Sequence, residues 1–229
     1  MALYYHHPEK GVVLENVNFI SNDLHHDGHL VRTFTQMLMK HLKESCQYEI
    51  TVVHRYSDGC AGQFRSRHTM MDVAEFSRDI SSQFENCMLI ANYGETSEFK
   101  NLCDGFGDHV KTPLKNAIVR EDLVLDSVIK VFNYLKENMT LEPLQTPRQV
   151  LYRRCFYYVD QKDTVRERAG KAVPGLLAVH SAVGIKPGFI GLRNITCYCA
   201  NCILDWNSRS CENKEYVQDW KVVHVRNEK

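Results

Sequence analysis

The order of local sequence patterns in the first half of the chain is the feature that most limits its fold. Strand-like and helix-like segments alternate there, which favours an α/β fold over an all-α or all-β one. Residues 86–93 form a short, nearly all-apolar run, typical of a strand that is covered on both faces. A helix is predicted at residues 29–45, where Leu30, Phe34 and Leu38 recur every fourth position on one face. We therefore expect a mixed sheet with flanking helices.

The rest of the chain supplies further elements of both kinds. Two strands at residues 2–6 and 11–21 are expected to form a hairpin. The other predicted elements are a strand at 48–56, helices at 66–84 and at 102–138 with a break near 120–122, and short strands at 150–160, 175–183, 188–199 and 217–226.

A change of character near residues 140–149 indicates a domain boundary. This stretch contains two prolines and is typical of a linker, and the segments after it are strand-like. The expected division is a core at residues 1–141 and a small β-rich tail at residues 142–229.

The charge balance produces no overall field that would attract nucleic acid. Lys and Arg total 28, as do Asp and Glu, so a nucleic-acid partner would need a local basic patch. No apolar run approaches the roughly 18 residues of a membrane span, and the N-terminal sequence lacks the pattern of a secretory signal. We expect an intracellular protein with no membrane partner.

Four of the nine cysteines fall within fifteen residues near the C-terminus. Cys197, Cys199, Cys202 and Cys211 have the spacing C-x-C-x2-C-x8-C, which suits tetrahedral Zn²⁺ in a structural site. An odd number of cysteines without a secretory signal indicates reduced thiols rather than disulfides. Two alternatives stay open: His180 replaces one cysteine at the metal, or the cysteines are ordinary buried thiols.

Two acids follow strand-like segments. Asp58 ends the strand at 48–56 and precedes Gly59, and Asp104 is expected in the first turn of the helix after residues 86–93. Carboxylates at one edge of a sheet could share divalent cations for phosphoryl chemistry. The alternatives are that Asp58 forms a turn or caps a helix, and that Asp104 only complements a helix dipole.

Basic residues surround Asp104. Lys100 and Lys111 lie on either side of it in the sequence and could contact phosphates. An exposed helix face also carries such charges without any ligand.

Four blocks of this sequence together resemble those of a known family. Residues 57–67, SDGCAGQFRSR, resemble the block S-D-G-x-x-x-Q-F-K-x-[KR], and residues 96–111, TSEFKNLCDGFGDHVK, resemble T-S-H-G-K-G-x-C-D-G-x-G-x-x-V-K. Residues 20–31, ISNDLHHDGHLV, and 193–202, RNITCYCANC, are similar to the blocks I-S-D-x-x-x-H-D and R-x-x-S-C-x-C-x-x-C. All four occur in transposon-derived proteins of animal genomes, which resemble DDE-type transposases or integrases with a ribonuclease-H-like core.

The resemblance implies both chemistry and partners. Asp58 matches the acid of the S-D-G block and Asp104 that of the C-D-G block, so both are implied to hold Mg²⁺ or Mn²⁺ for cleavage and transfer of DNA strands. The side chains implied to contact nucleic acid are Gln63, Arg65, Lys100 and Lys111. DNA is the implied partner, the nucleus the implied location, and an oligomer is compatible with this class.

The chain also departs from the family in two places. The family's first catalytic acid lies in a D-F-x-E-N-Y-like strand, and nothing before Ile20 matches it. The expected H-G-K-G is replaced by residues 98–101, EFKN. We therefore expect a ribonuclease-H-like core that lacks its first strand, either truncated or degenerate, with impaired catalysis. The alternative is a non-catalytic module of transposon origin that binds nucleic acid or protein.

Overall fold

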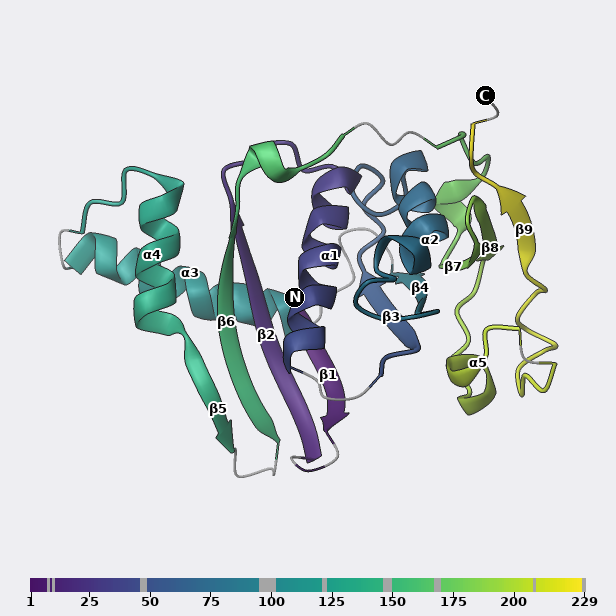
Figure 1. Cartoon of the computed structure of the whole chain (residues 1–229), viewed down its shortest axis with the longest axis horizontal. Helices are drawn as coiled ribbons and strands as arrows, with labels where there is room; N and C mark the ends of the chain where they lie inside the picture. The colour runs from purple at the N-terminus through teal and green to yellow at the C-terminus, as the bar shows by residue number, and fades with distance from the viewer. Residues whose placement is uncertain are drawn as a thin grey trace. The chain divides into compact units, whose positions relative to one another are not determined.

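The chain is a mixed α/β protein in two compact units. The computed structural model describes residues 1–7, 9, 11–45, 49–94, 102–120, 123–145, 150–166, 170–207 and 209–227. Within these residues the chain forms two mixed sheets and five α-helices (Figure 1), so the expected α/β class is confirmed.

Both units are discontinuous in sequence. The first consists of Met1–Leu24 and Lys100–Asp163, and the second of His25–Phe99 and Thr164–Lys229. The boundary predicted at residues 141 and 142 therefore falls inside the first unit.

The first unit contains a four-stranded sheet. Its order is β1 (Ala2–His7), β2 (Gly11–Ser21), β6 (Leu151–Val159) and β5 (Leu141–Gln145). Strands β1 and β2 form the antiparallel hairpin that the sequence predicts, whereas β2 and β6 run parallel although more than 100 residues separate them. The predicted linker contains β5, which pairs antiparallel with β6, so that part of the linker prediction is wrong.

Two helices complete the first unit. They are α3 (Leu102–Arg120) and α4 (Val128–Met139), and they confirm the predicted break in the helical region. The hydroxyl oxygen of Ser127 accepts a hydrogen bond from the backbone N–H of Lys130, which caps α4. Val110, Leu135 and Phe156 belong to one apolar cluster, which joins both helices to β6.

The second unit contains a five-stranded sheet in the order β3 (Val52–Ser57), β4 (Met88–Tyr93), β7 (Ser181–Lys186), β8 (Phe189–Arg193) and β9 (Lys221–His224). β3 and β4 are parallel, and the other neighbouring strands are antiparallel. Five of the six residues of β4 are buried, as its apolar sequence predicts.

Helices α1 (Gly28–Ser45) and α2 (Arg67–Asp79) belong to the second unit and pack against each other. α2 also packs on β7 and β4, and a buried ion pair ties it to the end of the chain. The fully buried carboxylate of Glu75 accepts two hydrogen bonds from Arg226, of 2.9 and 3.0 Å, and pairs with Arg78 at 2.8 Å. This bidentate contact holds the segment after β9 against α2.

Two segments of the second unit differ from the sequence prediction. Leu176–Ala178, predicted as the start of a strand, forms a short 3₁₀ turn, and β7 begins only at Ser181. A short helix, α5 (Ala200–Leu204), follows β8 where only strand was expected. None of the helices in the described ranges is long and apolar enough to cross a membrane.

Candidate metal centre

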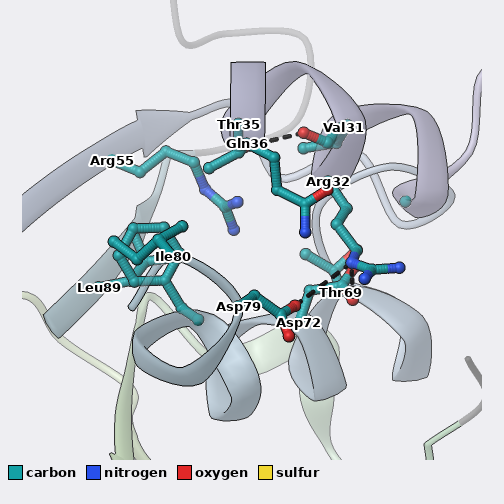
Figure 2. A pocket seen from close by; sticks show the side chains of 12 residues that line it. Val31, Arg32, Thr35, Gln36, Arg55, Thr69, Asp72, Asp79, Ile80 and Leu89 are labelled. Carbon is teal, nitrogen blue, oxygen red and sulfur yellow. Dashed lines mark hydrogen bonds and ion pairs between the residues drawn. The ribbon is translucent and has the colours of Figure 1, made fainter. Parts of the chain in front are cut away.

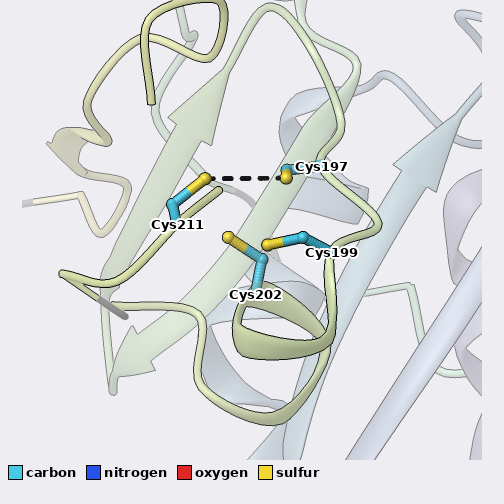
Figure 3. Close-up of side chains that lie close together, drawn as sticks. All are labelled: Cys197, Cys199, Cys202 and Cys211. Carbon is cyan, nitrogen blue, oxygen red and sulfur yellow. Dashed lines mark hydrogen bonds between the residues drawn. The ribbon is translucent and has the colours of Figure 1, made fainter. Parts of the chain in front are cut away.

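Four cysteine side chains converge in the second unit (Figure 3). The Sγ atoms of Cys197, Cys199, Cys202 and Cys211 all lie within 4.8 Å of one another. Cys197 Sγ and Cys211 Sγ are 3.6 Å apart, too far for a disulfide but close to the roughly 3.8 Å between sulfurs around one tetrahedral Zn²⁺. The cluster could therefore hold a metal ion, in agreement with the sequence prediction.

Three short segments bring these thiols together. Cys197 and Cys199 follow the end of β8, and Cys199 stands at the N-cap of α5, which carries Cys202. Cys211 lies in the loop that leads to β9. Among the described residues of 194–220, only Cys202 and Val217 are buried. A loop with so little apolar core needs another source of stability, and a bound metal supplies one.

Hydrogen bonds to sulfur favour the thiolate form that binds metals. The backbone N–H groups of Glu212 and Cys202 donate to Cys199, and these bonds lower the pKa of its thiol to about 7. The side-chain amide of Asn213 donates to Cys197 Sγ at 3.5 Å. Outside the cluster, burial instead raises the pKa of the Cys87 thiol to about 12 and keeps that thiol protonated. Within the cluster the shifts differ, because burial and the neighbouring thiols raise the pKa of the Cys202 thiol. The lowered pKa is thus a property of Cys199.

His180 is not a member of this group. Its Nδ1 lies 2.9 Å from the backbone oxygen of Tyr93, and all four potential ligands are cysteines. The suggestion that His180 replaces a cysteine is wrong, because its ring serves the junction between β4 and β7.

The two predicted catalytic acids belong to different units. Asp58 follows β3, and its Oδ1 accepts a hydrogen bond of 3.3 Å from the backbone N–H of Cys60. This bond agrees with the alternative interpretation in which Asp58 forms a turn. Asp104 is exposed in the first turn of α3, where a carboxylate complements the helix dipole.

Among the described residues, neither acid belongs to a group that could hold a metal ion. Within the described residues, the cysteine cluster is the single group of three or more His, Cys, Asp or Glu side chains that could hold a metal. The acids present therefore do not support a Mg²⁺ or Mn²⁺ site.

Arg65 has a structural role rather than the exposed phosphate contact that the resemblance implies. It is 6% exposed, and its guanidinium donates to the backbone oxygens of Leu177 at 2.6 Å and Gly94 at 2.9 Å. A Cβ on Gly59 would lie 2.6 Å from Arg65 Cζ, so the glycine after Asp58 makes room for this guanidinium. The Asp58–Gly59 pair is thus explained by packing.

The other predicted nucleic-acid contacts differ in exposure. Gln63 is half-buried, and its backbone oxygen accepts a hydrogen bond of 2.7 Å from the hydroxyl of Thr69. Lys111 is exposed on α3, and Lys100 lies outside the described residues. Of the four, Lys111 is the one whose side chain is freely accessible in the described structure.

A small cavity with charged and apolar lining residues lies among α1, α2 and β3 (Figure 2). Arg32, Gln36 and Arg55 line one side, and Asp72 and Asp79 line the other. Its volume of about 20 Å³ suffices for one water molecule. Arg32 Nε lies 3.4 Å from Asp79 Oδ2, so this pocket is an internal ion-pair network and not a site for a larger ligand.

A larger groove beside the cysteine cluster escaped the sequence prediction. It has a volume of about 370 Å³, and Arg193, Trp206, Trp220 and Cys211 contribute to its lining. The signal was present in the sequence, because both tryptophans of the chain flank Cys211. Their shared location depends on the fold of the loop, which local patterns do not reveal.

Comparison with known proteins identifies a family but no characterised relative. Residues 1–196 match a family model described as Domain of unknown function (DUF8701). No curated protein and no solved structure matches the chain. The match covers most of the chain and ends directly before Cys197. The chain therefore belongs to the DUF8701 family.

Proposed function

We propose that the protein is a zinc-stabilised nucleic-acid-binding module of transposase ancestry that no longer cleaves DNA. The observation that carries this proposal is the convergence of four thiols in a loop that has little core of its own. A rigid, metal-held loop beside a sheet is suited to present side chains to a partner.

Zinc is the metal that this donor set favours. Four soft thiolates at tetrahedral spacing suit Zn²⁺ and leave no open coordination position for water or substrate. Such a closed site is structural rather than catalytic. When bound, the metal would crosslink three short segments, and the chain itself supplies the N–H donors that orient Cys197 and Cys199.

The proposed ancestry rests on the four sequence blocks, with support from the arrangement of the second unit. The parallel strands β3 and β4 are connected through α2, and Asp58 follows the first of them, as in a ribonuclease-H-like core. The proposed loss of catalysis rests on the sequence, in which residues 98–101, EFKN, replace the H-G-K-G of the family's block.

DNA binding without cleavage can be tested directly. We expect the full chain to retard duplex or single-stranded DNA in a gel, with affinity that falls as salt rises, because phosphate contacts release counterions. Incubation with Mn²⁺ should leave the DNA intact, and titration calorimetry with Mn²⁺ should give equal heats for wild type and Asp58→Asn. Asparagine can still accept the Cys60 N–H, so this variant retains the turn.

Two results would contradict the proposal in different ways. DNA cleavage by the wild type that disappears in both Asp58→Asn and Asp104→Asn would establish a surviving nuclease. Failure to retard any DNA or RNA, by protein that contains its metal, would favour a protein partner instead.

A further inference from the structure

The groove next to the cysteine cluster is lined by a buried cation. Arg193, the last residue of β8, is 9% exposed, and its Cζ lies 4.3 Å from the centre of the Trp220 ring. Its Nε is buried and makes no hydrogen bond within the described structure. A buried guanidinium is costly unless an anion or acceptor compensates it. Arg193 lines a groove of about 370 Å³, which offers space for such an anion.

The other charges in and near the groove largely cancel. Arg209 and Lys214 also line it and are exposed, whereas Asp219 is the one acid among the lining residues. Cys211 belongs both to the groove lining and to the cluster, and Zn²⁺ bound by four thiolates would carry a formal charge of about −2. Long-range attraction is therefore weak, and recognition would depend on direct contact between Arg193 and the anion.

The aromatic residues add a second requirement. Trp206 and Trp220 meet edge to face, with ring centroids 5.9 Å apart and an interplanar angle of 76°. The indole N–H of Trp220 donates to the backbone oxygen of Trp206 at 2.6 Å. This bond holds the two residues together and occupies the only donor of the Trp220 side chain. Both rings line the groove, and Trp220 has no side-chain N–H left to offer a ligand. Flat aromatic surface of this kind suits stacking without base preference.

We infer that this groove binds single-stranded nucleic acid, with a phosphate at Arg193 and a base stacked on Trp206. A nucleotide unit combines an anion with a flat aromatic ring, and the lining of the groove combines a guanidinium with indole rings. This inference rests on the proposed nucleic-acid-binding function and assigns a specific site and strand form to it.

Tryptophan fluorescence isolates this site, because the chain contains only two tryptophans and both line the groove. Titration of the metal-containing full chain with an oligothymidylate of about ten nucleotides should quench its fluorescence. Arg193→Met should weaken binding at least about tenfold and reduce the salt dependence by about one phosphate contact. Arg193→Lys keeps the charge and should bind more tightly than Arg193→Met.

A matched control removes a cation elsewhere on the same sheet. Lys186 is exposed and lies 4.5 Å from the Phe189 ring centre, away from the groove lining, so Lys186→Met should bind like the wild type. Arg209→Met changes an exposed groove residue that the fold does not need, and it should weaken binding about threefold. Metal content of one ion per chain verifies that each variant retains the loop. An oligouridylate in parallel distinguishes RNA from DNA as the source of the strand.

Several outcomes would overturn the inference. The first is that neither oligonucleotide quenches the fluorescence. The second is that Arg193→Met and Arg209→Met bind with the same affinity as the wild type. The third is that an oligoglutamate peptide of matched length quenches the fluorescence equally. The last result would assign the groove to an acidic protein segment. Gel retardation of duplex DNA without any change in tryptophan fluorescence would refute the groove and leave the proposed function intact.

Discussion

A Cys202→Ser variant is expected to lose its metal and the ordered structure of the loop at residues 194–220. Cys202 is 7% exposed and lies in α5, within this loop. A metal present at about a thousandfold its Kd stabilises the state that binds it by about 4 kcal/mol, and the loop has little apolar core to replace that contribution. The free energy of opening this loop should therefore fall by at least about 4 kcal/mol.

The rest of the second unit should remain folded in this variant. β7 and β8 pair with each other through a backbone ladder that contains no loop residue, and Arg226 holds the segment after β9 to the buried Glu75. Hydrogen exchange should therefore accelerate in the loop amides and stay slow in β4 and β7. A strong chelator should reproduce the same pattern in the wild type.

Cys60→Ser is the matched control for the metal prediction. Cys60 is a free, partly exposed cysteine in the turn after β3 and is not a member of the cluster. Native mass spectrometry should find one metal ion in this variant and none in Cys202→Ser. Identical metal content in the two variants would show that the cluster is not a metal site, and iron in place of zinc would correct the identity of the ion.

Local patterns predicted those parts of the molecule that local physics determines. α1 follows from apolar residues four positions apart, and β4 from a short apolar run, because each buries a face that its own sequence defines. The cysteine cluster was also predictable. Three of its members are only two or three residues apart, so a short loop can bring them together wherever it lies.

Long-range pairing is what the sequence did not reveal. The parallel pair β2 and β6 joins segments more than 100 residues apart, and this pairing makes both units discontinuous. β5 was interpreted as linker because of its proline, yet a strand at the edge of a sheet tolerates a residue without an N–H group.

In the candidate site, too, the sequence shows which residues are present but not which distant segments they contact. Arg65 has the sequence context of a nucleic-acid contact, but its carbonyl partners Gly94 and Leu177 come from distant segments. The sequence shows that an arginine is present, and the fold decides whether its guanidinium faces solvent. Arg193 is the opposite case, since nothing in its local sequence indicates a buried charge beside two tryptophans.

Gly184→Ala is expected to destabilise the second unit by about 3 kcal/mol or more. A Cβ at this position of β7 would lie 2.3 Å from the backbone oxygen of Val73 in α2, well inside van der Waals contact. A flexible side chain could rotate away from such a clash, but here a strand backbone meets a helix backbone. Relief requires α2 to move away from the sheet, and that movement would open the packing of its buried residues, which include Val73, Ala74 and Phe76.

The control for this substitution is Gly105→Ala in α3. Nothing lies within 4 Å of a Cβ at Gly105, and alanine favours a helix over glycine by roughly 0.5 to 1 kcal/mol, so this variant should be slightly more stable than the wild type. Urea unfolding followed by circular dichroism should thus shift in opposite directions for the two variants. An unchanged midpoint for Gly184→Ala would mean that α2 does not rest directly on β7. The support that α2 gives to β7, and through the sheet to β8 and Arg193, would then need another explanation.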